Sequence, residues 1–132
     1  MHILAKIQNR AIQSTMTILQ ALKKMDEVKV KMLFVFKDEQ FLSILTIGDI
    51  QRAIIRGVNL HDVVTSILQT QKKFVSPKEP LKQVRQKMLT LRAECMPVVG
   101  TDGELVDVYL WNEVFKHSET EQREKINLPV VI

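Results

Sequence analysis

The chain has 132 residues, of which 45% are hydrophobic and 26% charged, and its formal net charge is +4 at pH 7. This size and balance are typical of one soluble globular domain. Cationic side chains are interleaved with acidic ones instead of gathering with aromatic residues, so we expect no nucleic-acid partner. The sequence shows neither a secretory signal nor an apolar run near the ~20 residues of a membrane span, and its one cysteine suits a reducing compartment. A cytoplasmic location is expected.

The N-terminal part of the chain begins with a short apolar stretch around Ile12 and then changes to helical spacing. Ile18, Leu22 and Met25 recur at intervals that place them on one face of a helix. We therefore expect an amphipathic helix here, with that face turned towards the core.

Two strands and a second helix are predicted next. The apolar run at 33–36 is short and rich in β-forming residues, and a polar turn at 37–40 separates it from a second strand at 41–45. A helix is expected over 48–56, and Gly57 is suited to end it in the left-handed conformation.

The same order of elements recurs later in the chain. Residues 17–25 align with 80–88 at an offset of 63, and residues 32–38 align with 96–102 at an offset of 64. The one-residue slip is assigned to the connection between helix and strand, where an insertion costs little. In the second copy we expect an apolar stretch at 74–75, a helix around 81–91, strands at 97–99 and 105–109, and a closing helix at 111–116.

The predicted fold is α/β (α+β), made of two pseudo-symmetric β-α-β-β-α repeats packed as one module. The expected divisions are a first repeat with an N-terminal extension at 1–68, a second repeat at 69–117, a polar linker at 118–127, and the truncated first strand of a following domain at 128–132. Each repeat alone leaves one face of its sheet uncovered, so the two should pack together. Function is then expected in the cleft between them.

One motif, Ser43-Ile-Leu-Thr-Ile-Gly-Asp-Ile50, joins the second strand to the following helix. Thr46 and Asp49 can form a capping box, in which each side chain satisfies a backbone N–H of the first turn. They can also serve a ligand: the helix N-terminus attracts phosphate, the Thr46 hydroxyl donates to it, Asp49 accepts from ribose hydroxyls, and Gly48 permits close approach. The residues alone favour the cap.

The repeated strand, turn and SILTIGDIQRAI pattern resembles a cystathionine-β-synthase (CBS) domain pair, or Bateman module, over about residues 12–115. The resemblance implies a non-catalytic regulatory module whose Thr46 and Asp49 hold the phosphate and ribose of an AMP, ADP or ATP-type ligand. It also implies an apolar base pocket lined by Val75, Ser76, Met96 and Pro97. No required cofactor, catalytic group or metal site is expected.

The second repeat departs from the family pattern. Asp107 stands where the family has the motif glycine, as Ser43 does in the first repeat; Leu110 replaces the hydroxyl residue and Glu113 the acid. Leu110 cannot donate to a phosphate. We therefore expect at most one functional nucleotide site.

The C-terminal segment NLPVVI at 127–132 is similar to the opening strand of sugar-nucleotide nucleotidyltransferases. That similarity implies a catalytic domain in cis, regulated or dimerised by the CBS pair. Two hypotheses stay open: a nucleotide-sensing regulatory module, and a ligand-free module that assembles the parent as a homodimer.

Overall fold

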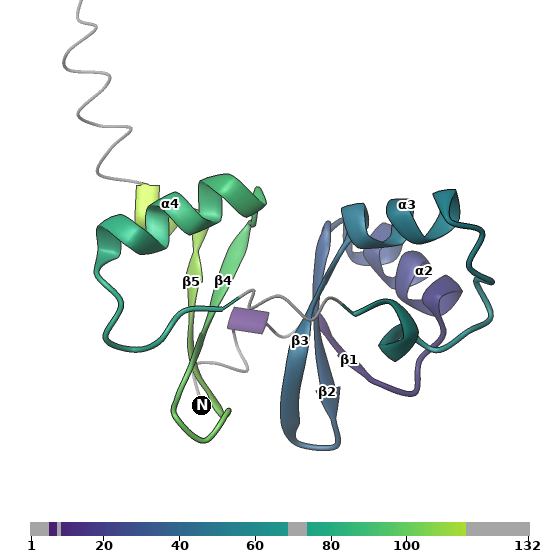
Figure 1. The fold of residues 1–132 in the computed structure, drawn as a ribbon, viewed down its shortest axis with the longest axis horizontal. Coiled ribbons are helices and arrows are strands. Elements are labelled where there is room, and N and C mark those ends of the chain that lie inside the picture. The colour runs from purple at the N-terminus through teal and green to yellow at the C-terminus, as the bar shows by residue number, and fades with distance from the viewer. Residues whose placement is uncertain (1–5, 8, 69–73, 116–132) are drawn as a thin grey trace, which may run out of the picture.

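The computed structural model describes residues 6–7, 9–68 and 74–115, so the linker predicted at 118–127 and the strand predicted at 128–132 lie outside it. The two repeats lie side by side, with strands of each near the middle of the molecule (Figure 1). Helices α2 (Ile18–Val28) and α3 (Ile47–Ile55) lie on the outer side of the first sheet. Within this described part, no helix has the length and apolar character needed to cross a membrane.

The first repeat contains a three-stranded sheet and two helices. Its elements are β1 (Ala11–Gln13), α2 (Ile18–Val28), β2 (Met32–Lys37), β3 (Gln40–Thr46) and α3 (Ile47–Ile55). Strand β2 is central, with β1 parallel to it on one side and β3 antiparallel on the other. This order confirms the prediction for the first repeat, with element ends moved by one or two residues.

Helix α2 has clear start and stop signals. Thr17 is its N-cap and forms a reciprocal capping box with Gln20, satisfying two backbone N–H groups of the first turn. The helix buries Ile18 and Met25 and ends at Lys29, which has a left-handed backbone (φ 59°). Its boundaries therefore follow from local chemistry, and its position follows from the apolar face.

The second repeat has the same elements in the same order. A 3₁₀ turn, Val64–Ile67, precedes it; α4 (Leu81–Leu91), β4 (Cys95–Val99) and β5 (Leu105–Leu110) follow, and residues 111–115 are helical. Val75 forms a parallel bridge with Val98, the counterpart of β1 beside β2. The predicted pseudo-symmetric α+β architecture is confirmed.

The strand register corrects the predicted alignment of the two repeats. Met32 pairs with Thr46, and the corresponding pair in the second repeat is Cys95 with Leu110. Met32 therefore corresponds to Cys95 and not to Met96, so the offset of 63 continues through the strand. The extra residue lies in the second hairpin turn, not in the helix-to-strand connection. A run in which every residue is apolar fits either alignment equally well, so the pattern alone could not fix the register.

The largest buried cluster is shared by both repeats. Phe34 and Ile44 of the first repeat pack in it with Val98 and Val108 of the second, and Ile7 of the N-terminal extension joins them. A separate cluster lies between the first sheet and its own helices. The shared cluster holds the two repeats against each other and fixes the walls of the cleft between them.

Candidate functional site

Helix α3 begins with a complete capping box. Thr46 is the N-cap; its hydroxyl oxygen accepts a hydrogen bond from the Asp49 N–H (3.2 Å), and its own N–H donates to Asp49 Oδ2 (2.9 Å). Two N–H groups that the helix itself cannot satisfy are thereby paired. The capping interpretation of this motif describes the geometry of the chain without a ligand.

Asp49 is the one buried charged side chain among the described residues, with 1% of its surface exposed. Its Oδ1 accepts a hydrogen bond of 2.6 Å from Arg52 Nη2, one helical turn later. The Arg52 side chain is 55% exposed and extends from the helix surface. Asp49 thus holds Arg52 close to the N-terminus of α3, where the helix dipole already favours negative charge.

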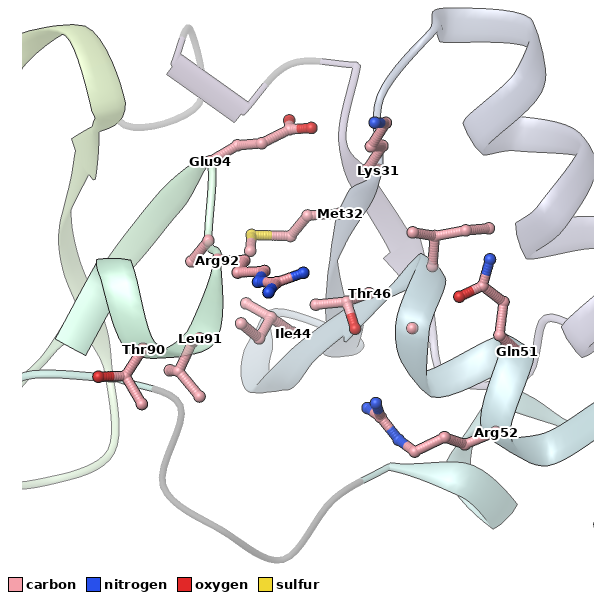
Figure 2. A pocket seen from close by; sticks show the side chains of 13 residues that line it. Lys31, Met32, Ile44, Thr46, Gln51, Arg52, Thr90, Leu91, Arg92 and Glu94 are labelled. Atoms are coloured by element: carbon pink, nitrogen blue, oxygen red, sulfur yellow. The ribbon is translucent and has the colours of Figure 1, made fainter.

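A pocket of about 820 Å³ opens beside this helix start. One wall comes from the first repeat, at the ends of β2 and β3 and the first turns of α3; the other comes from the second repeat, at the end of α4 and its connection to β4 (Figure 2). The lining residues are Lys31, Met32, Ile44, Thr46, Ile47, Gly48, Gln51, Arg52, Thr90, Leu91, Arg92, Ala93 and Glu94. This pocket therefore lies between the two repeats, where the sequence leads us to expect function.

The charges of the pocket favour an anion. Lys31, Arg52 and Arg92 line it, and the one acidic lining residue, Glu94, is paired with Arg10 Nη1 at 2.6 Å. The N-terminal end of α3 adds its partial positive charge. Lys31 and Arg92, together with Arg52 in its pair with Asp49, therefore give the pocket a positive character that suits an anion.

Arg92 occupies an unusual backbone position. It ends α4 with φ 53°, as Lys29 ends α2 in the first repeat with φ 59°. Glycine is favoured at such positions, and another residue costs about 1 kcal/mol. Figure 2 shows the Arg92 guanidinium reaching from the second repeat towards Thr46 and the Arg52 side chain. Arg92 is thus the cationic lining residue that the second repeat contributes to the pocket.

Two of the predicted site residues line the pocket. Thr46 and Gly48 are both there, and a Cβ on Gly48 would lie 3.3 Å from Arg52 Nη1 and 3.7 Å from Thr46 Oγ1. Asp49 supports the site from beneath and is not among the lining residues. Gly48 therefore keeps open the space directly over the helix start.

The residues predicted to line a base pocket lie elsewhere. Val75 and Met96 are buried in the cluster that the repeats share, and Pro97 is buried in β4 beside them. The Val75 N–H donates to the Pro97 carbonyl (3.0 Å), while Ser76 is exposed. None of the four is among the lining residues of this pocket, and their contact with a base stays a prediction.

The sequence interpretation missed two of the three cations that line the pocket. Lys31 and Arg92 both lie between a helix and the following strand, where polar residues are usually read as connections. The available signal was the repeat itself: a cation ends the first helix of both copies, at Lys29 and Arg92. Only the packing of the repeats shows which of these faces the cleft.

The comparisons with known proteins agree with this architecture. Residues 9–56 match the family model described as CBS domain. A CBS domain pair/ACT domain protein from Thermotoga maritima is 13% identical, with 84% of this chain and 88% of that chain covered and a TM-score of 0.63. A CBS domain protein from Pyrobaculum aerophilum complexed with AMP is 18% identical, with 83% and 90% covered and a TM-score of 0.63.

A third solved structure, CBSX2 in complex with AMP, is 19% identical, with 86% of this chain and 89% of that chain covered and a TM-score of 0.63. No curated protein matches the chain. The repeat, the strand order and these likenesses lead to one assignment. The segment 9–56 is a CBS domain, and the chain as a whole has the fold of a CBS domain pair.

Proposed function

We propose that this CBS pair is a non-catalytic regulatory module that senses one adenine-type nucleotide, AMP, ADP or ATP, in the pocket at the start of α3. The observation that carries this proposal is the convergence of Lys31, Arg52 and Arg92 on a helix N-terminus. Two structures of the same fold are complexes with AMP, which supports the choice of ligand class.

In this proposal the phosphate lies over the first turn of α3. The Thr46 hydroxyl donates to it, and Arg92 closes over it from the second repeat. An anion that pairs with Arg52 also draws that guanidinium away from Asp49, whose Oδ1 then accepts from a ribose hydroxyl. In this proposal Thr46 and Asp49 cap the helix before the nucleotide binds and contact the nucleotide afterwards.

The base needs an apolar surface, and the pocket has one. Met32, Ile44 and Leu91 are apolar residues that line it. We place the base against these residues and not against Val75 and Met96, because Val75 and Met96 do not line the pocket.

For the wider role we propose an attached sugar-phosphate nucleotidyltransferase domain as the regulated partner, supported by the similarity of residues 127–132 to the opening strand of such enzymes. The alternative function is ligand-free assembly, with the pair dimerising its parent. Exposed apolar side chains on the helices favour that alternative: Ile55 is 83% exposed, Ile54 50% and Leu89 55%. Such residues can cover one another across a homodimer interface.

The decisive variant is Arg92→Gly, because it separates binding from folding. Glycine relieves the left-handed backbone, so we expect the free energy of unfolding to rise by about 1 kcal/mol. Loss of a hydrogen bond to a charged group costs about 1.5–3 kcal/mol, so nucleotide affinity should fall by roughly 10- to 100-fold. Isothermal titration calorimetry with AMP, ADP and ATP measures the affinity, and urea unfolding measures the stability.

Lys29→Gly is the matched control. It relieves the same backbone conformation in the first repeat, and Lys29 does not line the pocket. Its stability should rise as in Arg92→Gly, with nucleotide affinity unchanged. If Arg92→Gly bound nucleotide as tightly as Lys29→Gly and wild type, Arg92 would not be part of the binding site. A wild-type chain that binds none of the three nucleotides would rule out the sensor, and a dimer in light scattering would then support the assembly module.

A further inference from the structure

The N-terminal extension places a lysine on the motif of the second repeat. Lys6 Nζ donates to the Val108 carbonyl (2.9 Å) and to Glu113 Oε1 and Oε2 (3.1 and 3.3 Å), and lies 3.4 Å from Asp107 Oδ1. These three groups come from β5 and from the helical residues after it. An ammonium group has three N–H donors, and here each has an acceptor group in reach.

The contacted residues are the counterparts of the nucleotide motif in the first repeat. Asp107 pairs with Val98 in the sheet as Ser43 pairs with Val35. Glu113 Oε1 accepts from the Leu110 N–H (3.1 Å), as Asp49 accepts from the Thr46 N–H. Lys6 therefore lies at the place in the second repeat that corresponds to the proposed nucleotide contacts of the first.

The lysine is held there by more than its charge. Its neighbour Ile7 is 1% exposed and belongs to the buried cluster that both repeats share. In Figure 1 the helical turn at residues 6–7 lies between the two sheets. The Lys6 side chain is only 21% exposed, compared with 40% for Asp107 and 46% for Glu113. The ammonium group is thus positioned by a buried anchor and not by a long-range surface attraction.

The protonation of Lys6 is consistent with this placement. Burial by itself lowers the pKa of Lys6, but the hydrogen bond to Glu113 and the charges of Asp107 and Glu113 outweigh it, so the pKa is raised above 10.5. The group stays charged over the physiological range.

We propose that the motif of the second repeat is an ammonium-binding site and that Lys6 is its built-in ligand. The site has two carboxylates where a phosphate site needs donors, and Leu110 has no hydroxyl. Its chemistry selects a primary amine and rejects an anion. The N-terminal extension occupies it from within the chain, and the pair keeps a single nucleotide pocket. This proposal does not rest on nucleotide binding.

Chemical rescue of Lys6→Ala tests the proposal. Removing the side chain leaves the two carboxylates together, and the thermal midpoint should fall by about 2–4 °C. Ethylammonium chloride should restore most of this loss, because its N–H groups can reach the same acceptors. Tetramethylammonium chloride at equal concentration, which has no N–H donor, should not. Lys82→Ala, on the exposed surface of α4, controls for the loss of one charge.

A second variant separates charge from shape. Glu113→Gln keeps an oxygen for the Leu110 N–H and loses the negative charge. In that background Lys6→Ala should lower the thermal midpoint by less than half as much as in wild type.

The outcomes decide the proposal either way. Selective rescue by ethylammonium together with a reduced effect in Glu113→Gln supports it. Equal responses to the two ammonium salts, or additive effects of the two substitutions, overturn it. Binding of a second equivalent of AMP by Lys6→Ala would also overturn it, since the exposed carboxylates are expected to reject an anion. All the thermal measurements are made without nucleotide, so they test this proposal even if the pocket of the first repeat binds no nucleotide.

Discussion

Asp49 and Arg92 show how much of a single residue's role can be predicted from the sequence. The motif spacing predicts that Thr46 and Asp49 meet at a helix start, and they do. It does not show that the Asp49 carboxylate is already bound by Arg52, because that contact depends on a rotamer of a long side chain. Arg92 could not be identified as a pocket residue from the sequence, since its direction is set by a left-handed backbone and by the packing of two distant segments.

Cys95 provides a prediction at this scale. Burial raises the pKa of its thiol, with the Glu94 and Glu113 carboxylates adding to the effect and Arg10 opposing it. The thiolate is therefore suppressed at pH 7–8, and the side chain is only 1% exposed. Iodoacetamide should label the native chain far more slowly than the chain in guanidinium chloride, with mass spectrometry as the measurement. Equal labelling rates in the two states would show that β4 opens readily.

At the scale of elements, the helices were predicted best where their ends have side-chain signals. Thr17 starts α2, Thr46 starts α3, and Gly57 (φ 82°) follows the end of α3 as expected. The predicted helix start at Gly48 was one residue late, because Ile47 continues the apolar run of β3 and its sequence context fits either element. The cap geometry resolves that ambiguity and the apolar pattern does not.

Gly48→Ala tests whether α3 approaches a ligand closely. Gly48 lies in the first turn without a positive φ, so alanine fits the backbone and should stabilise the helix by up to about 1 kcal/mol. The added methyl group narrows the space between Thr46 and Arg52, so nucleotide affinity should fall severalfold. Urea unfolding and calorimetry measure the two effects.

Gly57→Ala is the contrasting control for that experiment. Its φ of 82° disfavours alanine, and nothing lies within 4 Å of the added Cβ, so it should lose about 1 kcal/mol of stability and keep nucleotide affinity. A Gly48→Ala chain that binds AMP as tightly as wild type would place the phosphate away from the start of α3.

At the scale of the whole molecule, the internal repeat predicted the architecture, and the shared core joins the two repeats into one folded unit. The internal similarity is enough to infer two packed copies, because one copy alone exposes a sheet face. The predicted position of the inserted residue was wrong. Strands β2 and β4 are apolar at almost every position, so no alternation of polar and apolar residues fixes their alignment. The charged pocket could not be predicted either, because it lies between the end of α4 in one repeat and the start of α3 in the other.

The shared core predicts that the two repeats unfold together. Leu33 is fully buried in the cluster of the first repeat, whereas Trp111, the only tryptophan, belongs to the second and stacks on Phe115. Leu33→Ala should lower the free energy of unfolding by about 2–5 kcal/mol, the usual range for a buried leucine. Trp111 fluorescence should then show the same lowered midpoint as far-UV circular dichroism. An unchanged fluorescence midpoint would mean that the repeats fold independently.

The pocket walls belong to different repeats, and this has a mechanical consequence. A ligand bound as proposed above, at the start of α3 on one side and at Arg92 on the other, would bridge the two repeats. Its binding free energy would depend on the small differences in angle between the repeats that their shared core allows, so it would favour the angle that fits its length. Ligands that differ by one phosphate would then set different angles, and an attached domain could read the number of phosphates as a change in shape.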